Sequence, residues 1–80
     1  MDNNVVALEK LWQRLLDVTE VAAADNFFEQ GGDSLLALEM ATTFEESTGS
    51  PFPLDVLFSD GGFGAMCVAV SEPAAVNGQV

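Results

Sequence analysis

Ser34 is the side chain of this sequence whose setting best suits covalent chemistry. It lies in the run Asp-Asn-Phe-Phe-Glu-Gln-Gly-Gly-Asp-Ser-Leu-Leu, residues 25–36. Gly31 and Gly32 permit a sharp turn, because glycine adopts backbone angles that are closed to other residues. Asp33 and Ser34 are favoured at helix starts, where side-chain oxygens accept hydrogen bonds from unpaired amides. The run therefore predicts an exposed hydroxyl at a helix N-terminus, where the helix dipole favours a phosphate ester.

The residue types that are missing exclude several classes of catalysis. The sequence has no histidine, which excludes a Ser-His-Asp triad, a Cys-His pair and a histidine metal site. The single cysteine, Cys67, lies in an apolar run, which favours a reduced core thiol over a reactive nucleophile. Ser34 has no general base of its own, so a hydrolase is the weakest interpretation.

The charge balance is strongly acidic, with two basic side chains, 13 acidic ones and a formal net charge of −11. Binding of phosphate groups needs clusters of Lys and Arg, so we expect neither nucleic acid nor an anionic membrane surface as a partner. Basic protein surfaces are the expected partners, because an acidic field speeds their encounter. The alternative is that the charge only keeps a small apolar domain soluble.

The length of 80 residues and the hydrophobic content of 49% predict one small domain. We expect it to cover residues 1–72 and to be followed by a disordered tail over residues 73–80. No apolar stretch approaches the roughly 20 residues that span a bilayer. The acidic, polar N-terminus does not resemble a secretory signal, so a cytoplasmic location and a monomer are the default expectations.

The spacing of apolar residues predicts four helices. The first runs from Val5 to about Asp17, with apolar residues at three- and four-residue intervals. They are Val5, Leu8, Leu11, Trp12, Leu15 and Leu16. The second runs from Ser34 to about Thr48 and ends before Gly49. A short third helix covers Leu54 to Phe58, and a fourth runs from about Phe63 to Val70.

A long connection over residues 18–33 separates the first two predicted helices. Loops of this length in a compact domain carry function or pack by their own side chains. Phe27 and Phe28 are the expected anchors, with at least one ring in the core. We expect Trp12 and Phe28 to be structural, and truncation of a fully buried one to cost about 3–5 kcal/mol.

The second predicted helix has apolar residues on more than one face. Leu35, Leu38, Ala41 and Thr42 are expected to face the core, with Phe44 or Thr48 extending the stripe. Leu36, Ala37 and Met40 then form a second apolar cluster beside the serine, which we interpret as a surface for partner proteins. Val56 on the short helix is a further candidate for partner binding. The alternative is that this helix is buried on more than half its circumference.

The run around Ser34 resembles the cofactor-attachment motif of carrier proteins, in which Gly-Gly-(Asp or His)-Ser-Leu presents the serine that receives 4′-phosphopantetheine. The preceding Asp-Asn-Phe-Phe-Glu resembles the peptidyl carriers of nonribosomal peptide synthesis more closely than it resembles the acyl carriers of fatty-acid synthesis. The resemblance covers about Leu8 to Val70. It implies an all-α fold: a four-helix carrier-protein bundle with a long first loop and a short third helix. One departure is Asp60-Gly61-Gly62, because peptidyl carriers commonly have Pro and then Thr or Ser before the last helix.

The resemblance implies a carrier that performs no chemistry itself. A phosphopantetheinyl transferase would move 4′-phosphopantetheine from coenzyme A onto Ser34, with Asp33 as the flanking residue of the motif. The thiol of the arm would hold an aminoacyl or peptidyl thioester for adenylation and condensation or tailoring enzymes. A short chain that begins with Met is interpreted as a free-standing carrier, and a single module excised from a megasynthase is the alternative. The alternatives are an acyl carrier of polyketide or fatty-acid synthesis, which the net charge favours, and an unmodified helical interaction module.

Overall fold

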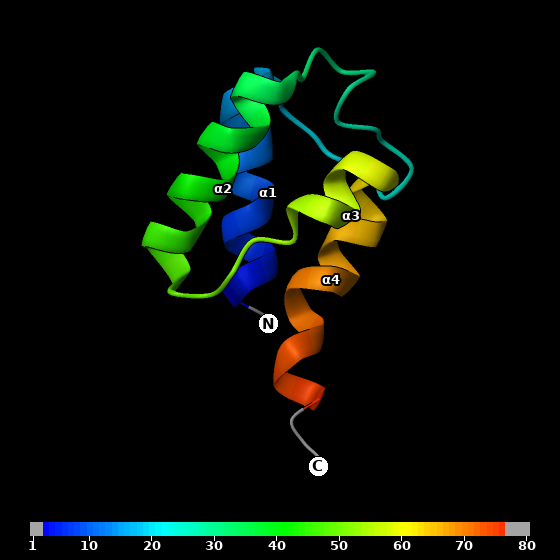
Figure 1. The fold of residues 1–80 in the computed structure, drawn as a ribbon. Helices are drawn as coiled ribbons and strands as arrows, with labels where there is room; N and C mark the ends of the chain where they lie inside the picture. The colour runs from blue at the N-terminus through cyan, green and yellow to red at the C-terminus, as the bar shows by residue number, and fades with distance from the viewer. Residues whose placement is uncertain (1–2, 77–80) are drawn as a thin grey trace.

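Four helices make up the regular structure of the described part of this chain (Figure 1). The structure is a computed structural model that describes residues 3–76, with side chains described through Ser71. In chain order the helices are α1 (Asn3–Leu16), α2 (Ser34–Thr48), α3 (Leu54–Ser59) and α4 (Phe63–Val76). Helices α1 and α2 lie side by side, and the loop between them arches over to the start of α4 (Figure 1). The predicted all-α fold with a long first loop and a short third helix is confirmed.

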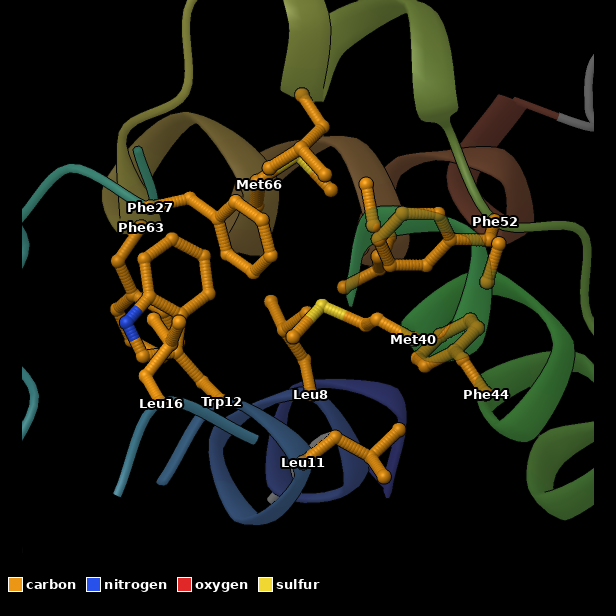
Figure 2. Packing of buried hydrophobic residues seen from close by; sticks show 14 residues of the cluster. Leu8, Leu11, Trp12, Leu16, Phe27, Met40, Phe44, Phe52, Phe63 and Met66 are labelled. Carbon is orange, nitrogen blue, oxygen red and sulfur yellow. The ribbon is translucent and has the colours of Figure 1, made fainter. Parts of the chain in front are cut away.

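The core is built on the apolar stripe of α1, as the sequence predicts. The buried residues of this helix are Leu8, Leu11, Trp12 and Leu16. The centroid of the Trp12 ring lies 5.4 Å from that of Phe27 and 5.0 Å from that of Phe63, both edge-on (Figure 2). Such aromatic pairs contribute about 0.5–1.5 kcal/mol beyond their buried area. Trp12 therefore joins α1 to both the long loop and the start of α4.

The buried face of α2 differs from the predicted one. Its buried residues are Ala37, Met40, Ala41 and Phe44. Leu35 and Leu38, which we expected in the core, are 77% and 53% exposed, and Thr42 is exposed as well. The prediction was therefore correct for Ala41 and Phe44 and wrong for these three residues. Small alanine side chains permit a close approach of packed helices, whereas a leucine at the contact holds them further apart.

The ends of the helices follow local backbone chemistry. Gly49 has φ +76°, and its N–H donates to the carbonyl of Glu45 at 2.9 Å, so it ends α2 as predicted. The last helix is longer than predicted and runs to Val76. Ser71, which follows the predicted end of this helix at Val70, donates its hydroxyl to the carbonyl of Cys67 at 2.8 Å and stays helical.

The predicted tail falls partly on α4 and partly outside the description. Residues 73–76 continue the helix, and residues 77–80 lie outside the described residues. The domain boundary at residue 72 stays a prediction. Among the described helices, none has the length and apolar character that a membrane crossing requires.

Candidate functional site

Ser34 is the first residue of α2, and its side chain is exposed. Asp33 precedes it as the N-cap, with an extended backbone at φ −143° and ψ −175°. The Asp33 carboxylate accepts a hydrogen bond from the amide of Leu36 at 2.9 Å, and its carbonyl accepts from that of Ala37 at 2.9 Å. These bonds satisfy amides that a helix start leaves unpaired. The predicted helix start is confirmed, and Asp33 sets the position of the Ser34 hydroxyl.

The turn that leads into this helix needs both of its glycines. Gly31 has φ +105°, a backbone conformation that other residues rarely adopt. The amide of Gly32 donates to the carbonyl of Phe27 at 2.9 Å. A Cβ on Gly32 would come within 2.3 Å of the Phe27 ring, so no other residue fits there without movement. The turn is thus held against a buried ring two residues before the serine.

The loop is also tied to α1 and to the start of α4. The indole N–H of Trp12 donates to the side-chain carbonyl of Gln30 at 2.9 Å. The amide of Phe27, which is fully buried, donates to the carbonyl of Gly61 at 2.8 Å. The amide of Phe63 donates to the carbonyl of Asp25 at 2.9 Å. Contacts with α1 and with the start of α4 therefore fix the loop that leads to Ser34.

The segment Asp60-Gly61-Gly62, where the sequence departs from the carrier-protein pattern, has its own way of starting α4. The carboxylate of Asp60 accepts from the amide of Gly62 at 3.0 Å, and thus supplies an acceptor where a capping hydroxyl is absent. Gly61 has φ +78°, and a Cβ there would lie 2.8 Å from the side-chain nitrogen of Asn26. That nitrogen donates to the carbonyl of Asp60 at 3.3 Å. The two glycines let the loop and the start of α4 meet directly.

The residues that we predicted as a partner surface do not share one exposed face. Ala37 and Met40 are fully buried, so their assignment to a docking surface was wrong. Leu36 and Val56 are half-buried and pack against the core. At about 100° per residue, Leu38 lies about 40° around α2 from Ser34, whereas Leu36 lies about 160° away.

The exposed apolar residues near Ser34 are ones that the sequence interpretation missed. The side chains of Leu35 and Leu38 on α2 are 77% and 53% exposed. Phe28, which we predicted to be a core residue, is 37% exposed and stacks on Phe58 of α3 at 5.9 Å between ring centroids. Phe27 is the buried ring of the pair. The i, i+3, i+4, i+7 spacing of Ala37, Met40, Ala41 and Phe44 was the signal that could have placed Leu35 and Leu38 outside.

The arrangement presents a hydroxyl without activating it. Among residues 3–71, whose side chains are described, the Ser34 side chain makes no hydrogen bond. The chain has no histidine to act as a base, and the described residues hold no cluster of three or more metal-ligating side chains. The described residues therefore hold the Ser34 hydroxyl at the surface of the start of α2 without a hydrogen bond to it.

Comparisons with known proteins agree with this geometry. The sequence pattern of a family described as "Phosphopantetheine attachment site" matches residues 6–70. Surfactin synthase subunit 1 of Bacillus subtilis (strain 168) is 42% identical over 52 residues, which are 65% of this chain and 1% of that protein. Indigoidine synthase of Dickeya dadantii (strain 3937) is 36% identical over 58 residues, which are 72% of this chain and 4% of that protein. The chain thus spans only a small part of these relatives.

Two solved structures share the fold. One is the phosphopantetheine transferase Sfp in complex with coenzyme A and a peptidyl carrier protein. It matches with a TM-score of 0.75 and 30% identity, over 89% of this chain and 92% of that one. The other is the solution structure of a peptidyl carrier domain of modular peptide synthetases. It matches with a TM-score of 0.68 and 31% identity, over 89% of this chain and 93% of that one.

Proposed function

This chain belongs to the family of phosphopantetheine attachment domains, and from that premise we propose that Ser34 carries the 4′-phosphopantetheine group. The observation that supports the proposal is the position of its exposed hydroxyl, directly after the N-cap Asp33 at the start of α2. A phosphate ester at this point lies at the positive end of the helix dipole. The family match covers both the serine and the helices that position it.

The attachment reaction transfers a group from coenzyme A to the serine oxygen. The Ser34 Oγ attacks the phosphorus that bears the pantetheine arm, forms a new P–O bond, and breaks the bond to the bridging oxygen of the pyrophosphate. Adenosine 3′,5′-bisphosphate leaves, and the hydroxyl proton passes to a base of the transferase. A base supplied by the transferase is supported by the absence of histidine from this chain and by a Ser34 hydroxyl that has no hydrogen-bond partner within residues 3–71.

We further propose that the loaded domain is a peptidyl carrier, a substrate of other enzymes and not itself an enzyme. The arm thiol would hold an aminoacyl or peptidyl group as a thioester, which activates the acyl carbon. Tethering raises the effective concentration of that group at adenylation and condensation or tailoring enzymes. The similarity to surfactin synthase and to two peptidyl carrier structures supports the peptidyl type over an acyl carrier.

Intact mass spectrometry tests the attachment. The full chain is incubated with coenzyme A and a broad-specificity phosphopantetheinyl transferase, and a gain of one phosphopantetheinyl group is expected. Ser34→Ala should fold normally and gain nothing. Ser59→Ala, at another exposed serine, should be modified like the wild type. Modification of Ser34→Ala would assign the group to a different residue. An unmodified wild-type chain would favour the unmodified interaction module.

The cargo is tested separately on the modified protein. Purified adenylation enzymes with amino acids form one set of assays, and acyl-transfer enzymes with acyl-coenzyme A donors form the other. Thioester formation in the first set alone is expected for a peptidyl carrier. Loading in the second set alone would assign the chain to polyketide or fatty-acid synthesis.

The surface that partner enzymes cover is proposed to lie on the exposed side of α2 beside Ser34. Leu35 and Leu38 supply its apolar contacts. Leu36, about 160° around the helix from Ser34, lies outside this surface, and half-buried Val56 on α3 stays a separate candidate for partner binding. Glu39 is exposed on the same helix, and its charge favours basic partners. We also propose that the domain acts as a monomer, since its net charge of −11 opposes self-association.

A further inference from the structure

The two basic side chains of this acidic chain lie on the same helix, α1, and line the same groove. Lys10 and Arg14 are its only basic residues, and both line a groove between α1 and α2. They are four residues apart on α1, so they are neighbours on one face, with Cβ atoms about 5–6 Å apart. Neither side chain makes an ion pair or a hydrogen bond with the side chains described, those of residues 3–71, although the chain has 13 acidic side chains. The basic side chains of this protein are thus concentrated on one face of α1.

The groove that these cations line also has apolar residues. It has a volume of about 360 Å³, and its lining includes Val6, Ala7 and Leu11 of α1. Leu11 is 6% exposed, and Val6 and Ala7 are half-buried. The opposite wall carries hydroxyl groups from α2, those of Thr43 and Ser47. A ligand that fits this lining has negative charges on one side and apolar groups below.

The groove is separate from the site of Ser34. Thr43 follows Ser34 by nine residues on α2, which corresponds to about 13 Å along the helix axis. Thr43 also lies about 180° around the helix from Ser34, at about 100° per residue. An enzyme that covers the serine and Leu38 therefore leaves this groove open.

We propose that this groove docks an acidic segment of a partner polypeptide. Carboxylates spaced by one helical turn match the spacing of Lys10 and Arg14. Apolar side chains between them would cover Val6 and Ala7 and supply affinity. The acidic field of the remaining surface repels such a segment, so the one pair of cations fixes where it binds. This site takes partners of the charge opposite to those that approach Ser34.

A defined probe tests the proposal. A synthetic helical peptide with Glu at positions i and i+4 and with Leu between them is titrated into the full chain. The amide chemical shifts of the protein are followed by NMR. Shifts are expected in residues 3–14 and 43–47, and binding is expected to weaken about tenfold in high salt, because salt screens the ion pairs. The double variant Lys10→Gln/Arg14→Gln is expected to weaken binding at least about tenfold.

A matched variant separates the groove from net charge. Thr19→Glu/Ala24→Glu changes the net charge by the same amount at two exposed loop positions, and it should bind the peptide nearly as the wild type does. Both double variants should keep the wild-type thermal midpoint, and both should be modified at Ser34, so that failure here is distinct from failure of the proposed function.

Three outcomes would overturn the proposal. The first is equal peptide binding by the wild type and Lys10→Gln/Arg14→Gln. The second is a set of shifts that lies outside the groove. The third is that free glutamate or inorganic phosphate shifts the same amides at the same concentration as the peptide, which would show a site for small anions only.

Discussion

Gly32 packs against the ring of Phe27 so closely that no side chain fits between them. A Cβ at position 32 would lie 2.3 Å from Cε2 and 2.4 Å from Cδ2 of this ring. The ring is fully buried and meets Trp12 edge-on at 5.4 Å between centroids. The serine that we propose as the attachment site is thus held by the packing of the core and not by its own contacts.

Gly32→Ala should destabilise the domain through this contact. We expect a loss of about 1–3 kcal/mol in the free energy of unfolding, since overpacking forces the ring or the backbone to move. Urea denaturation measures it. Phe27→Leu makes room, so Gly32→Ala should cost at least about 0.5 kcal/mol less in that background.

Gly31→Ala is the matched control for this comparison of Gly32→Ala with Phe and with Leu at position 27. Nothing lies within 4 Å of a Cβ on Gly31, and its cost comes from the backbone at φ +105°. That cost should be the same with Phe27 and with Leu at position 27. Equal costs of Gly32→Ala in both backgrounds would assign the cost to the backbone carbonyl of Phe27, from which the same Cβ would lie 2.7 Å, and not to the ring.

Asp33 should stabilise the start of α2 through its side-chain acceptor. Asp33→Ala removes the bond to the Leu36 amide and should cost about 1 kcal/mol, whereas Asp33→Asn keeps an acceptor and should cost less. Hydrogen exchange of the Leu36 amide should quicken in the alanine variant. Glu39→Gln, at an exposed carboxylate of the same helix, should leave this amide unchanged. Equal losses for Asn and Ala would assign the effect of Asp33 to its charge.

The two long helices show what the sequence could and could not establish. In α1 all four leucines and Trp12 fall on one stripe, so hydrophobicity and spacing agree, and the predicted face is correct. In α2 they conflict, because Leu35 and Leu38 are more apolar than Ala37 and Ala41. Packing favours the small residues, and the leucines stay at the surface. Three- and four-residue steps back from Phe44 lead to Ala41, Met40 and Ala37, which is the observed buried face. Giving this spacing more weight than the size of the leucines would have predicted it.

The junction of the loop with α4 could not be predicted in the same way. Asn26 accepts from the amides of Phe28 and Glu29 and donates to the carbonyl of Asp60. It also pairs with Gly62 in an isolated β-bridge. The contacts of Asn26 with Asp60 and Gly62 join residues far apart in the sequence and leave no periodic signal. The departure from the carrier-protein pattern at residues 60–62 is therefore understood only from the structure.

Phe27 and Phe28 should differ in their contributions to stability, although they are neighbours. Phe27 is fully buried, and Phe27→Ala should cost about 3–5 kcal/mol. That loss is comparable to the whole stability of a small domain, so the variant should be largely unfolded. Phe28 is 37% exposed, and Phe28→Ala should lower the thermal midpoint only modestly. Circular dichroism melts measure both. Equal losses would place both rings in the core.

Leu38 should act in partner docking, whereas Met40 should act in folding. Leu38 is 53% exposed and Met40 is fully buried. Met40→Asp places an unpaired charge in the core and should unfold the domain. Leu35→Asp and Leu38→Asp should keep the wild-type melt and slow the transfer of phosphopantetheine or of the aminoacyl group, because the enzyme must cover this flank of α2. Rates at equal protein concentration measure the effect.

Thr42→Asp provides the matched control for charge. Thr42 is exposed on the same side of α2, about 12 Å along the axis from Ser34. The substitution Thr42→Asp adds the same negative charge as Leu38→Asp, but outside the area next to Ser34. Leu38→Asp should therefore slow transfer more than Thr42→Asp does. Equal slowing would mean that net charge, and not apolar contact, governs the encounter. Wild-type rates for both leucine variants would move the docking surface to the exposed Phe28–Phe58 stack, because this is the other apolar surface that the loop and α3 present.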